Sequence, residues 1–187
     1  MLNSRTAESD NAAMRRLMLL RHAKTERSHP GELDRDRKLT KRGRADASAI
    51  GAYLAHHGLV PDLALVSPAR RAEETWTLLA AAFGKEPRAA KDDRIYNATA
   101  EKLIAVIGDV RKAHLLLMVG HNPGMQDLAR QLIASGDVEA RERVSEKLPT
   151  SGLVVIDFAF DDWSLLHPQA GRLERFVTPR LIAAAID

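Results

Sequence analysis

The stretch Leu17-Met18-Leu19-Leu20-Arg21-His22-Ala23 decides the fold, because an unbroken apolar run ends there on two polar side chains. Such a run is typical of a strand that is buried on both faces, as in a parallel sheet. In open parallel sheets, ligands bind at the carboxyl ends of the strands. Arg21 and His22 are therefore the first candidates for a functional site.

The rest of the chain alternates between strand-like and helix-like segments. Further strands are predicted at Leu63–Val66, Leu115–Val119, Gly152–Phe158 and Arg172–Val177, with a weaker edge strand inside Arg88–Ile95. Helices are predicted between Thr40 and Gly58, over Pro68–Phe83, from Thr99 onwards and from Met125 to about Ser135, with Thr40 and Ser67 as caps. This alternation predicts an α/β fold, a three-layer α/β/α sandwich around a mostly parallel sheet.

The composition is that of a folded protein with one domain. The 187 residues are 45% hydrophobic and 28% charged, and a chain of this length favours one sizeable core over two small ones. There is no cysteine, which excludes disulfides, thiolate metal sites and a cysteine nucleophile. A net charge of +3 with 4% aromatic residues argues against nucleic-acid binding and fits a basic pocket for a small anion.

The N-terminal segment sets the expected domain limits. Residues 1–16 are polar and lack the apolar core of a secretion signal, so we predict a disordered leader there and a single domain over residues 17–187. No apolar run approaches the roughly 20 residues that span a bilayer. The sequence therefore predicts a cytoplasmic protein with no membrane partner.

Three predicted strands end on side chains that suit phosphoryl transfer. Arg21 and His22 follow the first, Arg71 follows the second, and His121 follows the strand over residues 115–119. The carboxyl ends of parallel strands meet at one edge of the sheet, so these side chains are expected in one cleft. Arginine presents a planar charged fork to phosphate oxygens, and a neutral histidine nitrogen can attack phosphorus.

These properties assign a role to each side chain. We assign His22 as the nucleophile, with Arg21 and Arg71 binding the phosphoryl oxygens. His121 is assigned as a charged donor that also binds the phosphate and stabilises the transition state. The side chains already supply the counter-charge, so neither a metal nor another cofactor is predicted.

Each of these residues also has a structural interpretation. A single histidine near a strand end more often makes a structural hydrogen bond than a catalytic one. Arg70 is expected in a surface ion pair, Ser67 as a helix cap, and Gly120 and Gly124 in tight turns. These interpretations would have to hold together at three strand ends, which makes the functional interpretation the better one.

The motifs together resemble the histidine phosphatase superfamily, the phosphoglycerate mutase-like fold. Arg21-His22-Ala23 is similar to its Arg-His-Gly signature with alanine for glycine, Ser67–Thr75 to its second motif, and Val119–Gly124 to its third. In the second motif the phosphate-binding arginine directly precedes an alanine, which selects Arg71 over Arg70. The runs Arg37–Gly43 and Pro61–Leu63 are similar to the short phosphohistidine phosphatases of the SixA group. The resemblance spans about Leu17 to at least Leu132 and is loose beyond Gly136.

One departure from the superfamily concerns the general acid. Mutases and many phosphomonoesterases of the superfamily carry an acidic motif where this chain has Asp92–Thr99, which leaves Asp93 as a tentative acid. The leaving nitrogen of a phosphoramidate can be protonated before or during cleavage, so such a substrate needs a strong acid less than an ester does. The resemblance thus implies a phosphatase acting through a phosphohistidine intermediate on protein phosphohistidine.

Other functions and partners stay open on the sequence. A small-molecule phosphomonoesterase, a phosphotransferase or mutase, and an inactive phosphate-binding scaffold are the alternatives. The partner is correspondingly a phosphorylated protein, such as a phosphohistidine domain, or a small phosphorylated molecule. The charged loop over residues 24–38 is expected to be solvated, with steering of an acidic protein as the alternative. The sequence leaves the oligomeric state open.

Overall fold

The computed structural model describes residues 14–185, and these residues share a single sheet. Its strands are β1 (Arg15–Arg21), β2 (Leu63–Val66), β3 (Arg88–Lys91), β4 (Leu115–Gly120), β5 (Ile133–Gly136), β6 (Leu153–Phe158) and β7 (Gly171–Val177). The helices are α1 (Lys41–His56), α2 (Arg70–Ala80), α3 (Ala100–Gly108), α4 (Gly124–Leu132), α5 (Val138–Glu146) and α6 (Pro179–Ala184), with short 3-10 turns η1 (Asp34–Asp36), η2 (Asp93–Ile95) and η3 (Trp163–Leu165). No helix in the described part is long and apolar enough to cross a bilayer.

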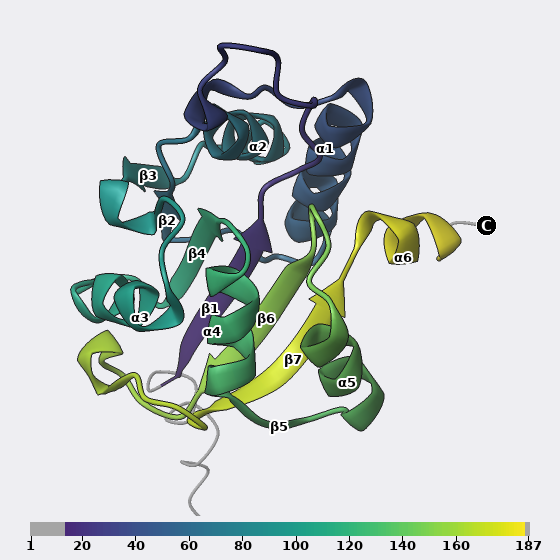
Figure 1. Ribbon diagram of the computed structural model, residues 1–187. Helices are drawn as coiled ribbons and strands as arrows, with labels where there is room; N and C mark the ends of the chain where they lie inside the picture. The colour runs from purple at the N-terminus through teal and green to yellow at the C-terminus, as the bar shows by residue number, and fades with distance from the viewer. Residues whose placement is uncertain (1–13, 186–187) are drawn as a thin grey trace, which may run out of the picture.

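The sheet has the order β3-β2-β4-β1-β6-β7-β5, which places β1 at its centre (Figure 1). β1 pairs in parallel with β4 and antiparallel with β6, and β2 pairs in parallel with both β3 and β4. Among the described strands β6 is the only one that runs against the rest, so the prediction of a mostly parallel sheet is confirmed. The carboxyl ends of β1, β2 and β4 therefore lie at the same edge.

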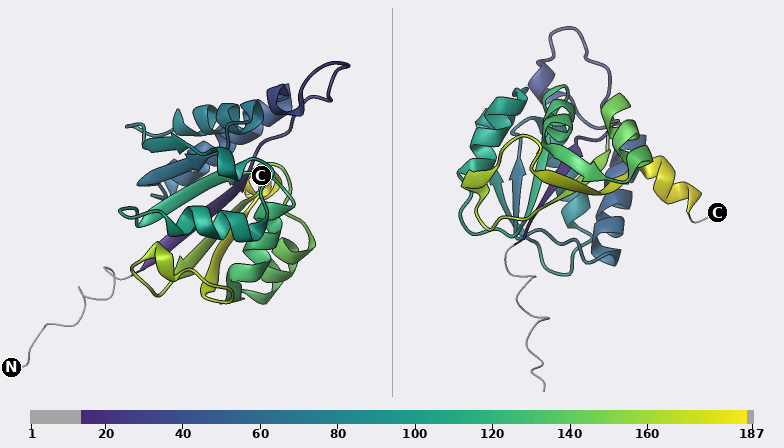
Figure 2. Two further views of the ribbon diagram at one scale, coloured as in Figure 1. Left: turned by 60° about the vertical axis from the view of Figure 1, so that its left-hand side comes forward. Right: turned by 90° about the horizontal axis from the view of Figure 1, so that it is seen from below.

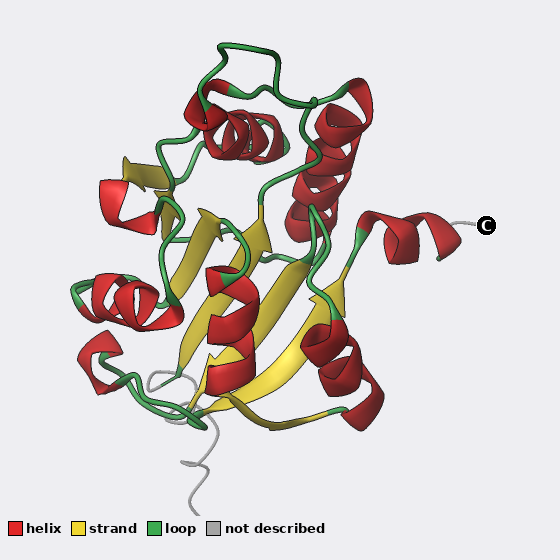
Figure 3. Cartoon of the chain, in the orientation of Figure 1, coloured by secondary structure: helices red, strands yellow, loops and turns green. Residues whose placement is uncertain are grey.

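Helices cover both faces of the sheet, as predicted for a three-layer sandwich (Figure 3). Leu17 and Leu19 pack on one face with apolar residues of α3, α4 and α5. Met18 and Leu20 pack on the other face with residues of α1 and α2. All four side chains of this run are fully buried, which explains why β1 has no polar alternation.

Several predicted boundaries are confirmed, and others differ for local reasons. Thr40 caps α1 by accepting from the N–H of Gly43, and Gly58 follows the helix with a φ of +67°. Helix α2 begins at Arg70 rather than Pro68, with Ala69 as its N-cap, so the prediction that Ser67 caps it is wrong. The hydroxyl of Ser67 instead pairs with His121, 2.6 Å away.

The chain termini differ from the prediction as well. β1 begins at Arg15 instead of Leu17, because Arg15 is buried and Arg16 forms a two-pronged ion pair with Asp157 of β6. The predicted limit of the leader thus falls inside a strand, and the rest of that leader, residues 1–13, lies outside the described residues. Strand β5 and helices α5 and α6 were not predicted. Only Val144 is buried in α5 and no residue in α6, so neither shows an apolar stripe.

Candidate active site

His22 follows β1 directly and is almost fully buried, with 9% of its surface exposed. Its Nδ1 lies 2.8 Å from the carbonyl oxygen of Ala23. A carbonyl can only accept a hydrogen bond, so Nδ1 carries the proton and Nε2 keeps its lone pair. The backbone carbonyl of Ala23 therefore orients this ring.

The surroundings of His22 keep its ring neutral. Burial, together with the positive charges of Arg71, Arg21 and Arg37, lowers the pKa of His22 to about 4, against the opposing effect of the Ala23 carbonyl. The ring therefore stays unprotonated across the neutral pH range. This is the protonation state in which an imidazole can act as a nucleophile.

We expect His22 to titrate with a midpoint near pH 4 in the ligand-free protein. Between pH 6.5 and 4 the unfolded chain binds a proton there that the folded protein does not, so the folded state loses stability as the pH falls through this window. Carbon-13 histidine spectra recorded against pH measure the midpoint, and the signal missing in His22→Ala identifies the residue. A midpoint at or above pH 6.5 would contradict this environment.

His121 follows β4 and faces His22, with 5.3 Å between the ring centroids. Its Nε2 lies 2.6 Å from the hydroxyl of Ser67. When that hydroxyl donates to Nε2, the ring proton is on Nδ1, which is buried and has no partner among the described residues. Nδ1–H is then a free donor for an oxyanion.

The protonation of His121 differs from the expectation of a charged ring. Burial, together with the electrostatic effects of Arg71, His22 and Arg21, lowers its pKa to about 3, while Asp34 opposes them. In the unliganded site the ring is therefore neutral. A phosphoryl dianion beside it would raise this pKa again, because an adjacent negative charge favours the protonated form.

The two predicted arginines lie beside these rings. Arg71, in the first turn of α2, is 4% exposed, and Arg21 ends β1. The charges of both lower the pKa of both histidines, so all four predicted residues share one electrostatic environment. Arg21 donates from Nη1 to the carbonyl of Leu148 at 3.1 Å, while its buried Nε has no partner in the part of the chain that the structure describes. The site thus combines two cations with two neutral imidazoles.

Comparison with known proteins supports the family that the sequence motifs resemble. The model of the histidine phosphatase superfamily (branch 1) matches residues 17–98. A structure from Agrobacterium tumefaciens, described as phosphohistidine phosphatase SixA, is 31% identical with a TM-score of 0.73, over 88% of this chain and 98% of that one. The chain belongs to the histidine phosphatase superfamily. The resemblance read from the motifs is confirmed.

A further structure supports a place in the SixA-type group of this superfamily, and an uncharacterised relative shows similarity over most of the chain. A SixA structure from Nakamurella multipartitia is 25% identical with a TM-score of 0.77, over 90% of this chain and 98% of that one. An uncharacterised protein of Mycobacterium tuberculosis is 36% identical over 165 residues, which are 86% of this chain and all of the relative. The similarity therefore extends beyond Gly136, into the part of the chain where the resemblance of the motifs is loose.

Asp93, the tentative acid, lies on η2 away from this histidine phosphatase site. Its side chain is 85% exposed and pairs with Arg35, 2.9 Å away. No interaction in the described part of the chain joins its carboxylate to either histidine. Tyr96, which directly follows η2, reaches the site instead. Its ring is edge-on to that of His121, with 5.4 Å between the ring centroids. The structure therefore adds no support for Asp93 as the acid.

Two residues of the site were missed by the sequence analysis because they act through distant contacts. The N–H of Ser151 lies 3.1 Å from the carbonyl of Arg21 and 3.2 Å from that of His22, with a φ of +57° that few serines adopt. Thr75, fully buried in α2, accepts from the N–H of Ala23 at 3.0 Å and donates to the carbonyl of Arg71 at 2.6 Å. The only sequence signals were Ser151 beside Gly152 and Thr75 at the end of the second motif.

We expect Thr75→Val to lower the free energy of unfolding by about 1–3 kcal/mol, because it leaves the buried N–H of Ala23 without a partner and removes the hydroxyl's bond to the carbonyl of Arg71. Thr75→Ser keeps the hydroxyl and is expected to lose less. Denaturant unfolding of the two variants measures the difference. Equal loss in both variants would assign the effect to packing of the methyl group rather than to the hydrogen bonds.

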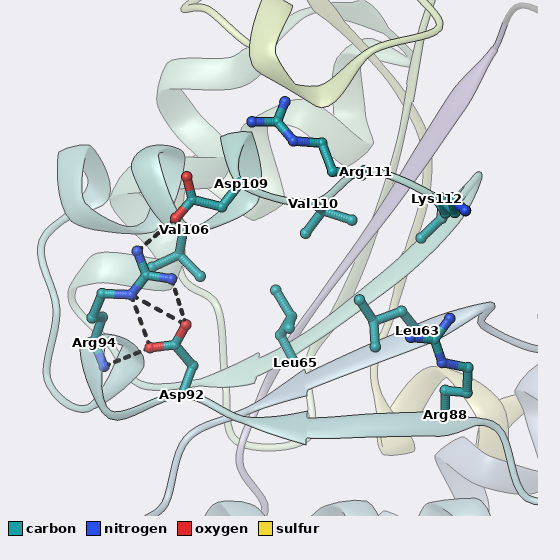
Figure 4. Close-up of a pocket in the computed structure, with 11 residues that line it drawn as sticks. Leu63, Leu65, Arg88, Asp92, Arg94, Val106, Asp109, Val110, Arg111 and Lys112 are labelled. Atoms are coloured by element: carbon teal, nitrogen blue, oxygen red, sulfur yellow. Dashed lines mark hydrogen bonds and ion pairs between the residues drawn. The ribbon is translucent and has the colours of Figure 1, made fainter.

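A second cleft, of about 380 Å³, lies between β2, β3 and the end of α3 (Figure 4). Arg94 projects into it and donates to both Asp92 and Asp109, with Nη distances of 2.7 Å to each. The cleft shares no lining residue with the histidine site, and carboxylates already neutralise its central guanidinium. Its lining includes further cations in Arg88, Arg111 and Lys112, but among the described residues it contains no histidine that could attack a phosphoryl group.

Arg70, next to Arg71, forms an ion pair on the surface of the protein. Its Nε donates to Glu74 at 2.7 Å on the exposed side of α2. The predicted surface ion pair is thus present, whereas Arg71 is buried toward the histidines. The two arginines are adjacent in the chain, and the helix directs one side chain to solvent and the other to the histidines.

Proposed function

We propose that the chain is a phosphatase that works through a phosphohistidine intermediate on His22. The observation that carries this is the buried, neutral imidazole, whose Nδ1 is held by Ala23 and whose Nε2 is left free. Arg21 and Arg71 lie within electrostatic reach of it. This combination suits attack on a phosphoryl group better than it suits a structural histidine.

The proposed reaction has two steps. The lone pair of His22 Nε2 attacks phosphorus while the bond to the leaving group breaks, and the leaving atom takes a proton. Water then attacks phospho-His22, which releases phosphate and restores the neutral ring. Arg21, Arg71 and the Nδ1–H of His121 hold the phosphoryl oxygens through both steps and stabilise the negative charge on them. The protein groups themselves provide the counter-charge, so the proposal includes no metal.

We place protein phosphohistidine first among substrates. Two of the similar structures are described as phosphohistidine phosphatases. No carboxylic acid of η2 contacts the histidines among the described residues, which favours a leaving group that is easily protonated, such as a phosphoramidate nitrogen. A phosphorylated protein is then the partner, and a cytoplasmic location stays a prediction.

The test is parallel hydrolysis of a phosphohistidine-carrying protein domain and of p-nitrophenyl phosphate. We expect the larger kcat/KM on phosphohistidine. Equal or faster turnover of the ester would replace the substrate class by small phosphate esters. No turnover of either substrate, with phosphate still bound, would leave an inactive phosphate-binding scaffold.

A further inference from the structure

An acidic side chain of this protein already occupies the phosphate-binding arginine. Arg71 donates from Nη1 to the main-chain carbonyl of Asp34 at 2.6 Å and from Nη2 to its Oδ2 at 3.0 Å. The hydroxyl of Tyr96 donates to the same Oδ2 at 2.8 Å. Both terminal nitrogens of the guanidinium are thus engaged by one residue that the sequence analysis did not single out.

Asp34 belongs to a segment separate from the strands that build the site. It lies on η1 in the loop over residues 24–38, which projects from the body of the protein beside α2 (Figure 2, left). Its side chain is 48% exposed, whereas that of Arg71 is 4% exposed. The carboxylate therefore reaches a buried cation from the solvent side, which is the side from which a substrate arrives.

The contacts keep this carboxylate charged. Partial burial raises the pKa of Asp34, but hydrogen bonds from Tyr96, Arg37 and Arg71 outweigh it and bring the pKa to about 2. A charged carboxylate and a phosphoryl oxygen on the same guanidinium nitrogens would repel each other. An incoming phosphoryl group must therefore exchange with the carboxylate.

We propose that Asp34 is a specificity-determining residue that acts as an internal competitor for Arg71. It supplies the counter-ion that a buried guanidinium requires in the free protein. A phosphoryl dianion displaces it, because such a dianion binds Arg21, Arg71 and His121 together. A monoanion such as a carboxylate replaces one ion pair by an equivalent one and gains little. The inference rests on the proposed function only in that the site must bind phosphate; it does not require that the protein hydrolyses a substrate.

The consequence is a pocket that prefers phosphoryl groups to carboxylates, although its affinity for phosphate is lower than it would be without Asp34. We expect Asp34→Asn to bind inorganic phosphate about three- to tenfold more tightly than the wild type, because a partly exposed ion pair no longer has to be broken. Acetate is expected to gain affinity by a larger factor, because it depends on Arg71 whereas phosphate also binds Arg21 and His121. The preference for phosphate over acetate is therefore expected to narrow.

Titration calorimetry with inorganic phosphate and with acetate measures these affinities without requiring turnover. Asp36→Asn is the matched control, since it removes the same charge from the same 3-10 turn at an exposed position. It is expected to change phosphate affinity by less than about twofold. Tyr96→Phe removes one partner of Asp34 and is expected to shift phosphate affinity in the same direction by a smaller factor.

The outcomes separate this inference from the proposed function. Unchanged or weaker phosphate binding by Asp34→Asn would overturn it and would make Asp34 a residue that positions Arg71. Tighter phosphate binding in both Asp34→Asn and Asp36→Asn would overturn it in favour of a general effect of loop charge. Tighter phosphate binding in Asp34→Asn alone, with a narrower preference for phosphate over acetate, would support it, even for a protein that hydrolyses neither substrate. Tighter binding with an unchanged preference would overturn the role in specificity.

Discussion

Replacing His22 by alanine is expected to lower turnover of any phosphorylated substrate by roughly four orders of magnitude or more, because the covalent step loses its nucleophile. Water cannot replace it efficiently, since no other imidazole in the described site presents an oriented free nitrogen. Within residues 14–185 the side chain of His22 makes a single hydrogen bond, to Ala23, so its removal is expected to leave the fold intact. Steady-state kinetics and thermal unfolding of the variant measure the two effects.

The same variant reports on the intermediate. The wild type mixed rapidly with a labelled substrate is expected to carry acid-labile phosphate on His22, and His22→Ala is expected to carry none. His29→Ala is the control, because His29 is an exposed histidine on the loop that follows the same strand. Retention of turnover in His22→Ala, or loss of turnover in His29→Ala, would contradict the assigned nucleophile.

Replacing Arg71 by alanine is expected to lower kcat/KM by about 10²–10³-fold, because a buried cation that faces the developing charge is lost. Phosphate affinity is expected to fall as well, since both the ground state and the transition state use the guanidinium. Arg71→Lys keeps the charge but not the two-pronged fork, so a partial loss is expected. Kinetics and phosphate calorimetry measure these losses.

Arg70→Ala provides the matched control for this variant. It removes the same charge one residue earlier, where the guanidinium is exposed and pairs with Glu74. Its effect on kcat/KM is expected to be less than about threefold. Comparable losses in the two variants would show that the basic character of the α2 N-terminus, and not the fork of Arg71, accounts for phosphate binding.

Several features of the fold follow from patterns that are local in the sequence. The apolar run of β1, the Thr40 cap and the segment Leu63–Val66 depend on residues a few positions apart, and all were predicted correctly. The parallel topology then placed Arg21, His22, Arg71 and His121 in one environment, because strand ends in such a sheet share one edge. Local pattern and topology were sufficient for those four positions.

The protonation states and partners of these residues depended on tertiary contacts. Ser67 meets His121 over a separation of 54 residues, Arg71 meets Asp34 over 37, and Arg21 meets the carbonyl of Leu148 over 127. No local periodicity encodes such pairs, since they depend on the path that each loop takes across the folded surface. The same holds for the burial that keeps both histidines neutral.

The sequence by itself therefore determined the family, the central strand and the identity of the nucleophile candidate. Short-range patterns of apolar, capping and motif residues carry that information along the chain. Only the tertiary structure decided that Ala23 orients His22, that His121 is neutral, and that Asp34 pairs with Arg71. Those properties arise from desolvation and from charges brought close in space, which exist only once the chain has folded.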